Sequence, residues 1–194
     1  MSISAKDVKA LRDRTGAGMM DCKKALTETN GNLEDAIDLM RASGAAKVAK
    51  RAEKIASEGT IGSYLHFDNR VASMVELNCE TDFVANTDEF KALARDIALH
   101  IASQAPQGVS DSDIASEVLD RERKVYEGQV KEEGKPEHIA EKIVEGKMRK
   151  YFEENTLLAQ PFVKNPDQTI AELITEISAK TGEKIEIARF VRMK

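Results

Sequence analysis

Residues 76–86, Glu-Leu-Asn-Cys-Glu-Thr-Asp-Phe-Val-Ala-Asn, join a strand pattern to a helix pattern and decide the fold of this chain. The turn at the join places Asp82 beside Phe83, just before a helix that starts at Thr87. A carboxylate next to a large aromatic ring at the tip of a turn suits entry into another protein. It suits catalysis poorly, because no base, nucleophile or metal cluster accompanies it. The strand that leads into the turn alternates in the manner of a half-buried strand, with one face formed by Val71, Ser73, Val75, Leu77 and Cys79.

The segments on either side of this stretch predict a hairpin followed by an amphipathic helix. Two β-rich runs, 60–67 and 70–79, flank Asp68-Asn69, which is typical of a tight turn. The helix after Thr87 should end before Pro106. One face of that helix is apolar throughout, with Phe90, Leu93, Ala94, Ile97, Ala98 and Ile101.

The first 44 residues predict a module of three short helices. Ser4 and Asp7 form a capping box at its start, and Ser43-Gly44 closes it. Residues 45–58 favour helix by propensity but carry almost no large apolar face, so they predict a linker helix. The remainder, 59–194, predicts an α+β core.

The C-terminal part of that core predicts a helical hairpin, a further helix and a last strand. Residues 111–154 supply the two helices of the hairpin, 111–133 and 137–154. Thr169 begins a second capping box, and Gly182 ends the helix that follows it. The last strand should pair with the earlier hairpin, which gives a small antiparallel sheet with packed helices.

Composition excludes several classes of function. The 194 residues are 41% hydrophobic and 32% charged, with a net charge of −5. An acidic chain is a poor free nucleic-acid binder, since phosphate contacts dominate that affinity, so we expect no direct nucleic-acid partner. No apolar run is long enough to cross a bilayer and no targeting pattern precedes the first helix, so we expect a cytoplasmic protein without a membrane partner. Cys22 and Cys79 lie in apolar patterns and read as reduced core thiols.

A second candidate binding surface lies in the segment 11–26. Its Gly16-Ala17-Gly18 permits a tight turn but lacks the spacing of a phosphate-binding loop. Two adjacent residues cannot share one helical face, so at least one of Met19 and Met20 should point outward. An exposed methionine near Arg12 and Lys23 suits an adaptable protein-binding surface, although methionine is also a common core filler.

Three segments resemble the elongation factor Ts family, in the expected order and over most of the chain. The segment 11–26 resembles the ubiquitin-associated-like (UBA-like) N-terminal module of that family, and 76–86 is similar to its second signature. The third match runs from Lys135 through Lys147 and continues at Gln160–Val163. The resemblance makes residues 1–44 a UBA-like three-helix module.

The resemblance implies a guanine-nucleotide exchange factor for the GTPase elongation factor Tu, with no catalytic residue, cofactor or metal of its own. In that family a turn intrudes between helices of the GTPase near its magnesium site. Carried over, this wedge consists of Thr81, Asp82, Phe83 and Val84. The module would contact the GTPase through Arg12, Met19, Met20 and Lys23. From the residues alone, the simpler interpretation is that Asp82 caps the turn and Phe83 fills the core.

The resemblance also bears on His66 and on the oligomeric state. The segment 62–66 looks like one in the longer family members, in which a histidine approaches the phosphate loop of the GTPase, and this suggests the same role for His66. The longer members have two related sheet-and-helix halves, whereas this chain has room for one. We therefore expect a homodimer, formed through the core sheet.

Two other classes of function stay open at this stage. An enzyme would use Cys79 as nucleophile with His66 or His100 as base, and it would need an exposed thiol. A ubiquitin-like adaptor would use the N-terminal bundle, but it leaves the wedge and the C-terminal match without a purpose.

Overall fold

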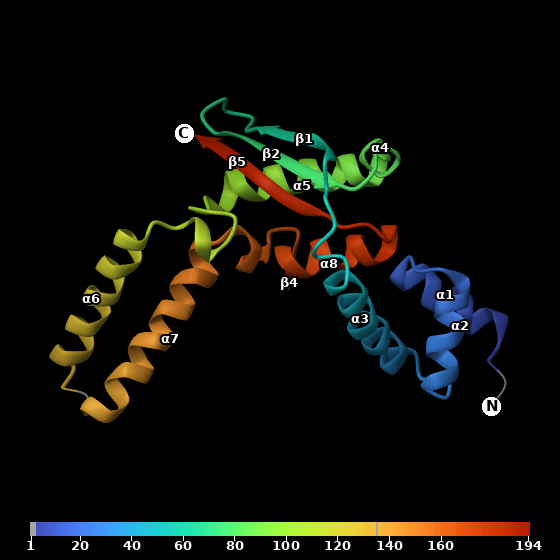
Figure 1. Ribbon diagram of the computed structural model, residues 1–194, viewed down its shortest axis with the longest axis horizontal. Helices are drawn as coiled ribbons and strands as arrows, with labels where there is room; N and C mark the ends of the chain where they lie inside the picture. Colours follow the sequence, from blue (N-terminus) through green and yellow to red (C-terminus); the bar gives the residue numbers. More distant parts are fainter. Residues whose placement is uncertain (1–2, 135) are drawn as a thin grey trace. The chain divides into compact units, whose positions relative to one another are not determined.

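The computed structural model describes residues 3–134 and 136–194, and in these the α+β prediction is confirmed (Figure 1). The described residues form eight α-helices and a small antiparallel sheet in the order β1-β2-β5. Lys135, the first residue of the third family-like segment, lies outside the described residues. The chain divides into two compact units. The first contains the described residues up to Gly59 together with Asn78–Val84 and Ile174–Glu186, and the second contains the rest.

A three-helix bundle forms most of the first unit, as the sequence predicted. Its helices are α1 (Ala5–Thr15), α2 (Met19–Glu28) and α3 (Leu33–Ala49). The capping box of Ser4 and Asp7 is present at the start of α1, where each side chain bonds the other's backbone N–H. The small core of the bundle consists of Val8, Leu11, Cys22, Ala25, Leu26 and Ala36.

The linker helix expected at 45–58 is wrong in its bounds. α3 continues through Gly44 to Ala49, and the next residues form tight turns, such as the bond from Lys54 N–H to the Arg51 carbonyl. Gly44 lies within the helix and is buried. A Cβ at this position would lie 3.1 Å from the Cβ of Ala179. Glycine here permits close packing of α3 on another helix. Beyond Ala49 the chain has almost no large apolar side chain to bury, so helix packing offers it little stabilisation.

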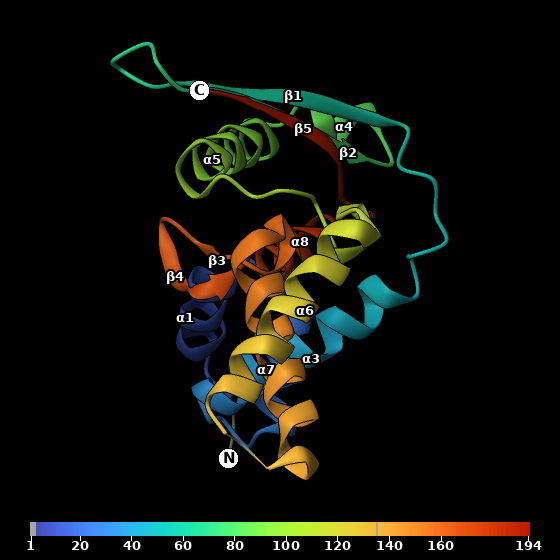
Figure 2. The ribbon, with the colours of Figure 1, turned by 90° about the vertical axis from the view of Figure 1, so that its left-hand side faces the viewer.

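The sheet of the second unit is covered on one face by α5 (Asp88–Gln104), as Figures 1 and 2 show. Its strands are β1 (Glu58–Leu65), β2 (Ala72–Cys79) and β5 (Glu186–Met193). Thr87 is the N-cap of α5, as predicted, and the last strand pairs with the hairpin. The Ser73 hydroxyl donates to the Ala98 carbonyl at 2.5 Å and Arg192 donates to the Ala102 carbonyl, so β2 and β5 are both tied to α5.

The opposite face of the sheet is apolar and exposed. The alternation that points Ser73 and Arg192 toward α5 sends the intervening side chains the other way. Arg189 and Glu76 form an ion pair there, 2.7 Å apart. The large apolar residues of this open face are each between 45% and 60% exposed: Ile61, Leu65, Met74, Val191 and Met193.

The helical hairpin is confirmed, with α6 (Ser116–Glu132) packed against α7 (Glu137–Asn155). Val130, Val144 and Met148 fill the space between the two helices. A short 3-10 turn, Asp111–Asp113, precedes α6, so the first helix begins later than residue 111. No helix in the described part of the chain is long and apolar enough to cross a membrane.

The stretch after α7 contains a small strand pair that the sequence did not predict. β3 (Pro161–Phe162) pairs with β4 (Asn165–Thr169). His100 is fully buried beside it, with its Nε2 2.9 Å from Gln160 and its Nδ1 accepting from Val163 N–H. Burial lowers the pKa of His100, so a neutral ring fills the position. The predicted capping box of Thr169 and Glu172 then starts α8 (Ile170–Thr181).

Candidate partner-binding site

The turn at the end of β2 presents Phe83 to solvent. Residues Asp82–Ala85 form α4, a single helical turn that follows β2 directly. Phe83 is 83% exposed and Asp82 is exposed, while Ala85 points inward and is buried. The alternative in which Phe83 fills the core is therefore wrong. The protein's own fold leaves this large apolar side chain uncovered, so it is available to a partner.

Glu183 holds the backbone at the start of this turn. Its carboxylate accepts hydrogen bonds from the Glu80 and Thr81 N–H groups, both at 3.1 Å, and from the Thr81 hydroxyl at 2.6 Å. That hydroxyl also accepts from Val84 N–H at 3.5 Å, in the manner of a helix N-cap. The Glu183 carboxylate thus holds in place Glu80 and Thr81, the two residues that directly precede α4.

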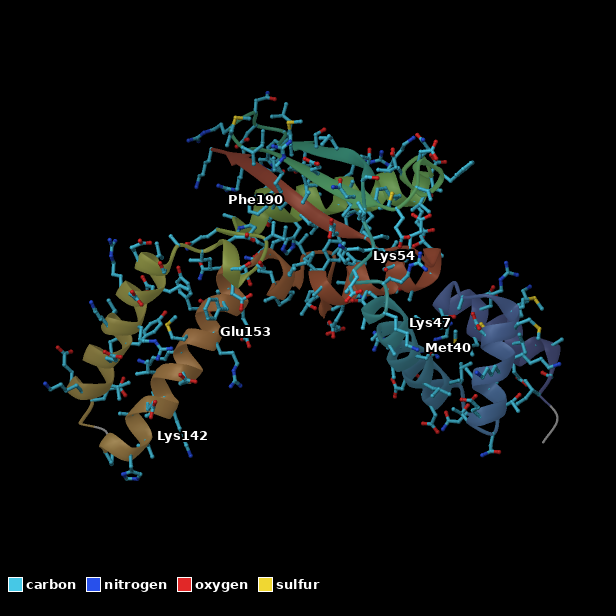
Figure 3. All side chains as sticks on the ribbon, in the orientation of Figure 1. Met40, Lys47, Lys54, Lys142, Glu153 and Phe190 are labelled. Atoms are coloured by element: carbon cyan, nitrogen blue, oxygen red, sulfur yellow. The ribbon has the colours of Figure 1, made fainter. Side chains whose placement is uncertain are left out.

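Glu80 makes the reciprocal set of contacts. Its carboxylate accepts two bonds from the Arg51 guanidinium, at 2.8 and 2.6 Å, and one from Lys184 N–H at 2.6 Å. The Arg51 hydrogen bonds, and after them the Lys184 N–H, lower the pKa of Glu80 from 4.5 to about 2. Lys54, labelled in Figure 3, adds a smaller electrostatic contribution in the same direction. We refer to Arg51, Glu80 and Glu183 as the carboxylate cluster.

An open hollow of about 350 Å³ lies beside Phe83. It is lined by Glu58, Glu80, Thr81, Asp82 and Phe83 itself. Three of these five side chains are acidic and one is a large aromatic. The surface around Phe83 therefore combines negative charge with one exposed apolar group.

The methionine turn of the N-terminal module is also exposed. Gly16 caps α1 with φ at 65°, and Gly18 is the N-cap of α2. Met19 is 55% exposed and Met20 77%, so both methionines face solvent, where the pattern required only one. Arg12 and Lys23 are exposed as well. The structure thus leaves all four candidate residues of the module on the surface of the first unit.

His66 lies in the second unit, at the end of the β1-β2 hairpin. Its Nδ1 is 3.0 Å from the Tyr64 hydroxyl, and its ring centroid is 4.3 Å from that of Phe67. The ring is half-buried, whereas Phe67 is 88% exposed. The role suggested for His66 stays a prediction.

Cys79 lacks the environment of a nucleophile. The residue is fully buried, and its thiol donates to the Thr81 carbonyl at 3.1 Å. The enzyme alternative required an exposed thiol, so this observation contradicts it. Cys22 is buried as well, and the prediction of two reduced core cysteines is confirmed.

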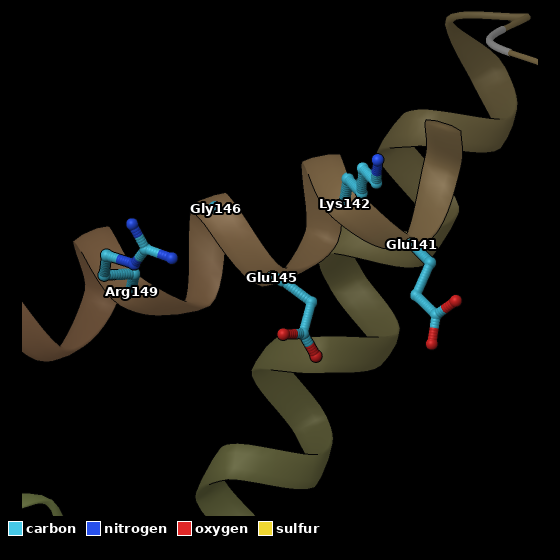
Figure 4. Close-up of a pocket in the computed structure, with 5 residues that line it drawn as sticks. All are labelled: Glu141, Lys142, Glu145, Gly146 and Arg149. Atoms are coloured by element: carbon cyan, nitrogen blue, oxygen red, sulfur yellow. The ribbon is translucent and has the colours of Figure 1, made fainter. Parts of the chain in front are cut away.

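A second hollow, on the hairpin, is a poor candidate for a binding site. It measures about 520 Å³ and runs along the exposed side of α7 (Figure 4). Two carboxylates and two cations line it with a glycine, and no apolar side chain joins them. The lining residues are Glu141, Lys142, Glu145, Gly146 and Arg149.

The carboxylate cluster is the part of the site that sequence reasoning missed. Glu80 lies inside the decisive stretch, but its partners Arg51 and Lys184 are 29 and 104 residues away. No local pattern predicts contacts over such separations. The one available signal was the excess of charge around Thr81, a residue otherwise suited to a turn.

A small α+β fold that presents large apolar side chains on short turns is typical of a protein that binds other proteins. The sequence comparisons narrow this class. The family model described as Elongation factor TS matches residues 3–194, so the chain belongs to the elongation factor Ts family. The family name gives it a role in translation elongation.

Curated relatives agree over nearly the whole chain. The chain is 53% identical to an Elongation factor Ts of Carboxydothermus hydrogenoformans over 192 residues, which are 99% of this chain and 88% of the relative. It is 52% identical to that of Thermosipho melanesiensis over 98% of this chain and 97% of the relative. For Syntrophobacter fumaroxidans the identity is 50% over 100% of this chain and 97% of the relative. The resemblance inferred from three segments is confirmed.

Proposed function

We propose that this protein is a guanine-nucleotide exchange factor that binds elongation factor Tu in its GDP form and promotes release of GDP and Mg²⁺. The observation that carries the proposal is the 83% exposure of Phe83 on a turn fixed by long-range hydrogen bonds. Membership of the elongation factor Ts family and its role in translation support it. The reaction would take place in the cytoplasm, where elongation occurs.

The proposed mechanism is differential binding. GDP and Mg²⁺ hold the GTPase pocket in one arrangement, and this protein binds a second arrangement that grips them less well. The coupling is reciprocal, so nucleotide weakens the binding of the factor as much as the factor weakens the binding of nucleotide. The chain would do no chemistry of its own and would need no cofactor.

Phe83 would act as the wedge, with Thr81 and Val84 fixing its turn. Burial of one phenylalanine yields about 1.5–3 kcal/mol, which is about one to two decades of coupling. Asp82 would disturb the ordering of the magnesium ligands. It would not bind the ion itself, because a lone carboxylate is too little to form a Mg²⁺ site.

A coupling to nucleotide affinity larger than this would also need contacts from the N-terminal module. Met19 and Met20, flanked by Arg12 and Lys23, would contact the nucleotide domain of the GTPase. Flexible thioether side chains adapt to a partner surface that changes during exchange. We assign this contact to the N-terminal three-helix bundle, α1 to α3, as a UBA-like module.

We also propose that the protein is a homodimer through the open face of the sheet. Five large apolar side chains there are roughly half exposed, which is unusual for a monomer surface. Size-exclusion chromatography with light scattering should give the mass of a dimer for the wild type. Met74→Asp, on the open face, should give a monomer, while Val125→Asp on α6 should not. A wild-type monomer that is fully active in exchange would remove this part of the proposal.

The function is tested by release of labelled GDP from purified elongation factor Tu. The wild-type chain should accelerate release, and Phe83→Ala should lose about 10- to 100-fold of that acceleration, in keeping with the burial of one phenylalanine. Val125→Ala, which trims an exposed apolar side chain on α6, is the matched control and should behave as wild type. Equal rates with and without the wild-type protein would refute the proposal.

A further inference from the structure

The turn that carries Phe83 is too short to hold its own shape. α4 has four residues. Helix nucleation is unfavourable, and isolated helices below about 12–15 residues are marginal in water. The direction in which Phe83 projects therefore depends on contacts from outside α4.

The carboxylate cluster supplies those contacts as two reciprocal sets of bonds. Glu183 binds the backbone N–H groups of Glu80 and Thr81, and the Glu80 carboxylate in turn binds the N–H of Lys184. The end of β2 and the segment before β5 each use a side chain to hold the other's backbone. Bonds of this kind, in which one partner is ionised, are about twice as strong as neutral ones.

Arg51 adds a third segment to this arrangement. Its guanidinium bonds both oxygens of Glu80 through Nε and Nη2. The pair is partly shielded, since the Glu80 side chain is 15% exposed and that of Arg51 37%. A two-point contact fixes the orientation of the carboxylate as well as its position, which a lysine could not do.

We propose that Arg51, Glu80 and Glu183 are positioning residues for nucleotide exchange, which hold residues 80–84 so that Phe83 is already in its docking direction before the GTPase arrives. This inference rests on the proposed function. A binding element that is ordered beforehand loses less conformational entropy on association, so more of its contact energy is available for coupling. Exchange would then depend on three side chains that need not touch the GTPase.

The test combines Glu183→Ala with Phe83→Ala in the GDP-release assay. Glu183→Ala alone should reduce the acceleration about tenfold, as expected when a charged acceptor of several hydrogen bonds is removed. In a chain that already carries Phe83→Ala, the same change should have little further effect, because the side chain that it positions is gone. A residue with a general structural role would instead multiply the loss in both backgrounds, and that result would overturn the proposal.

Conservative and control variants complete the experiment. Glu183→Gln keeps an acceptor oxygen and should recover part of the activity lost in Glu183→Ala. Asp96→Asn removes the charge from another 2.6 Å ion pair, with Lys164 in the second unit, and should leave exchange unchanged. If Glu183→Ala fails to fold, Arg51→Ala serves in its place, because it removes two bonds to Glu80 from a partly exposed site.

The outcomes separate this inference from the proposed function. Wild-type activity in both Glu183→Ala and Arg51→Ala, with Phe83→Ala impaired, would overturn the positioning role and leave the exchange function standing. A wild-type protein that fails to accelerate GDP release would overturn both.

Discussion

The two exposed turns of this molecule are built in different ways. The turn at 80–84 is held by charged hydrogen bonds that Arg51 donates and Glu183 accepts, and both residues are remote in sequence. The turn at 15–20 uses local contacts: Gly16 adopts a left-handed conformation, and the Thr15 hydroxyl bonds the Leu11 carbonyl four residues earlier. The turn at 80–84 presents a rigid aromatic side chain. The turn at 15–20 presents two flexible thioether side chains.

This difference suggests a division of labour. A wedge must keep its direction while it displaces part of a partner, and fixed charged bonds at its base serve that need. A surface that follows a moving partner gains from side chains with several rotatable bonds. The first turn should therefore be sensitive to single changes, and the second should tolerate them.

The largest expected contrast is between Phe83→Ala and Met20→Ala. Loss of the ring should reduce the acceleration of GDP release about 10- to 100-fold. Met20→Ala should reduce it only about two- to fivefold, because the adjacent Met19 can repack toward the partner and a sulfur–aromatic or apolar contact is individually weak. Both variants are measured by GDP release over a range of factor concentrations. A Met20→Ala loss as large as that of Phe83→Ala would contradict the division of labour.

The sequence predicted the elements that local patterns specify. Thr87 capped α5, the boxes at Ser4 and Thr169 started their helices, and the alternation of β2 placed Cys79 inside. Each rests on residues within a few positions of one another. The β3-β4 pair was missed because its first strand, Pro161–Phe162, has two residues and offers no period to detect.

For the candidate site, the sequence predicted which side chains would be exposed, but not which contacts hold them in place. Phe83 and the methionines stand out as large apolar residues at turns. The contribution of Glu183 depends on a carboxylate meeting a backbone 102 residues away. The predicted end of the third helix at Gly44 was wrong for a similar reason, since the close approach of Gly44 to Ala179 is a tertiary contact.

Acid should weaken the first turn through Glu80. The pKa of this group is about 2 in the folded protein and 4.5 ordinarily, so its stabilising effect is complete above pH 4.5 and is lost as pH falls toward about 2. At pH 7, Glu80→Gln should lower the free energy of unfolding by roughly 1.5–3 kcal/mol, the usual value for a hydrogen bond to a charged group. The gap between wild type and variant, from urea unfolding at several pH values, should narrow across this window. A gap that stays constant down to pH 2 would be inconsistent with the assignment.

The smallest expected effect belongs to Gly16→Ala in the second turn. Gly16 has φ at 65°, and an added Cβ would lie 3.0 Å from the flexible end of the Lys180 side chain, which can move aside. The main cost is therefore the left-handed backbone, about 1 kcal/mol of unfolding free energy. Gly128→Ala in α6 is the matched control, because nothing lies near its new Cβ and the change should stabilise the helix by about 0.5–1 kcal/mol. Exchange should fall less than about twofold in Gly16→Ala, since the cost is far smaller than the folding free energy of a domain and the methionines can readjust. A loss approaching that of Glu183→Ala would mean that the methionine turn is held as rigidly as the wedge.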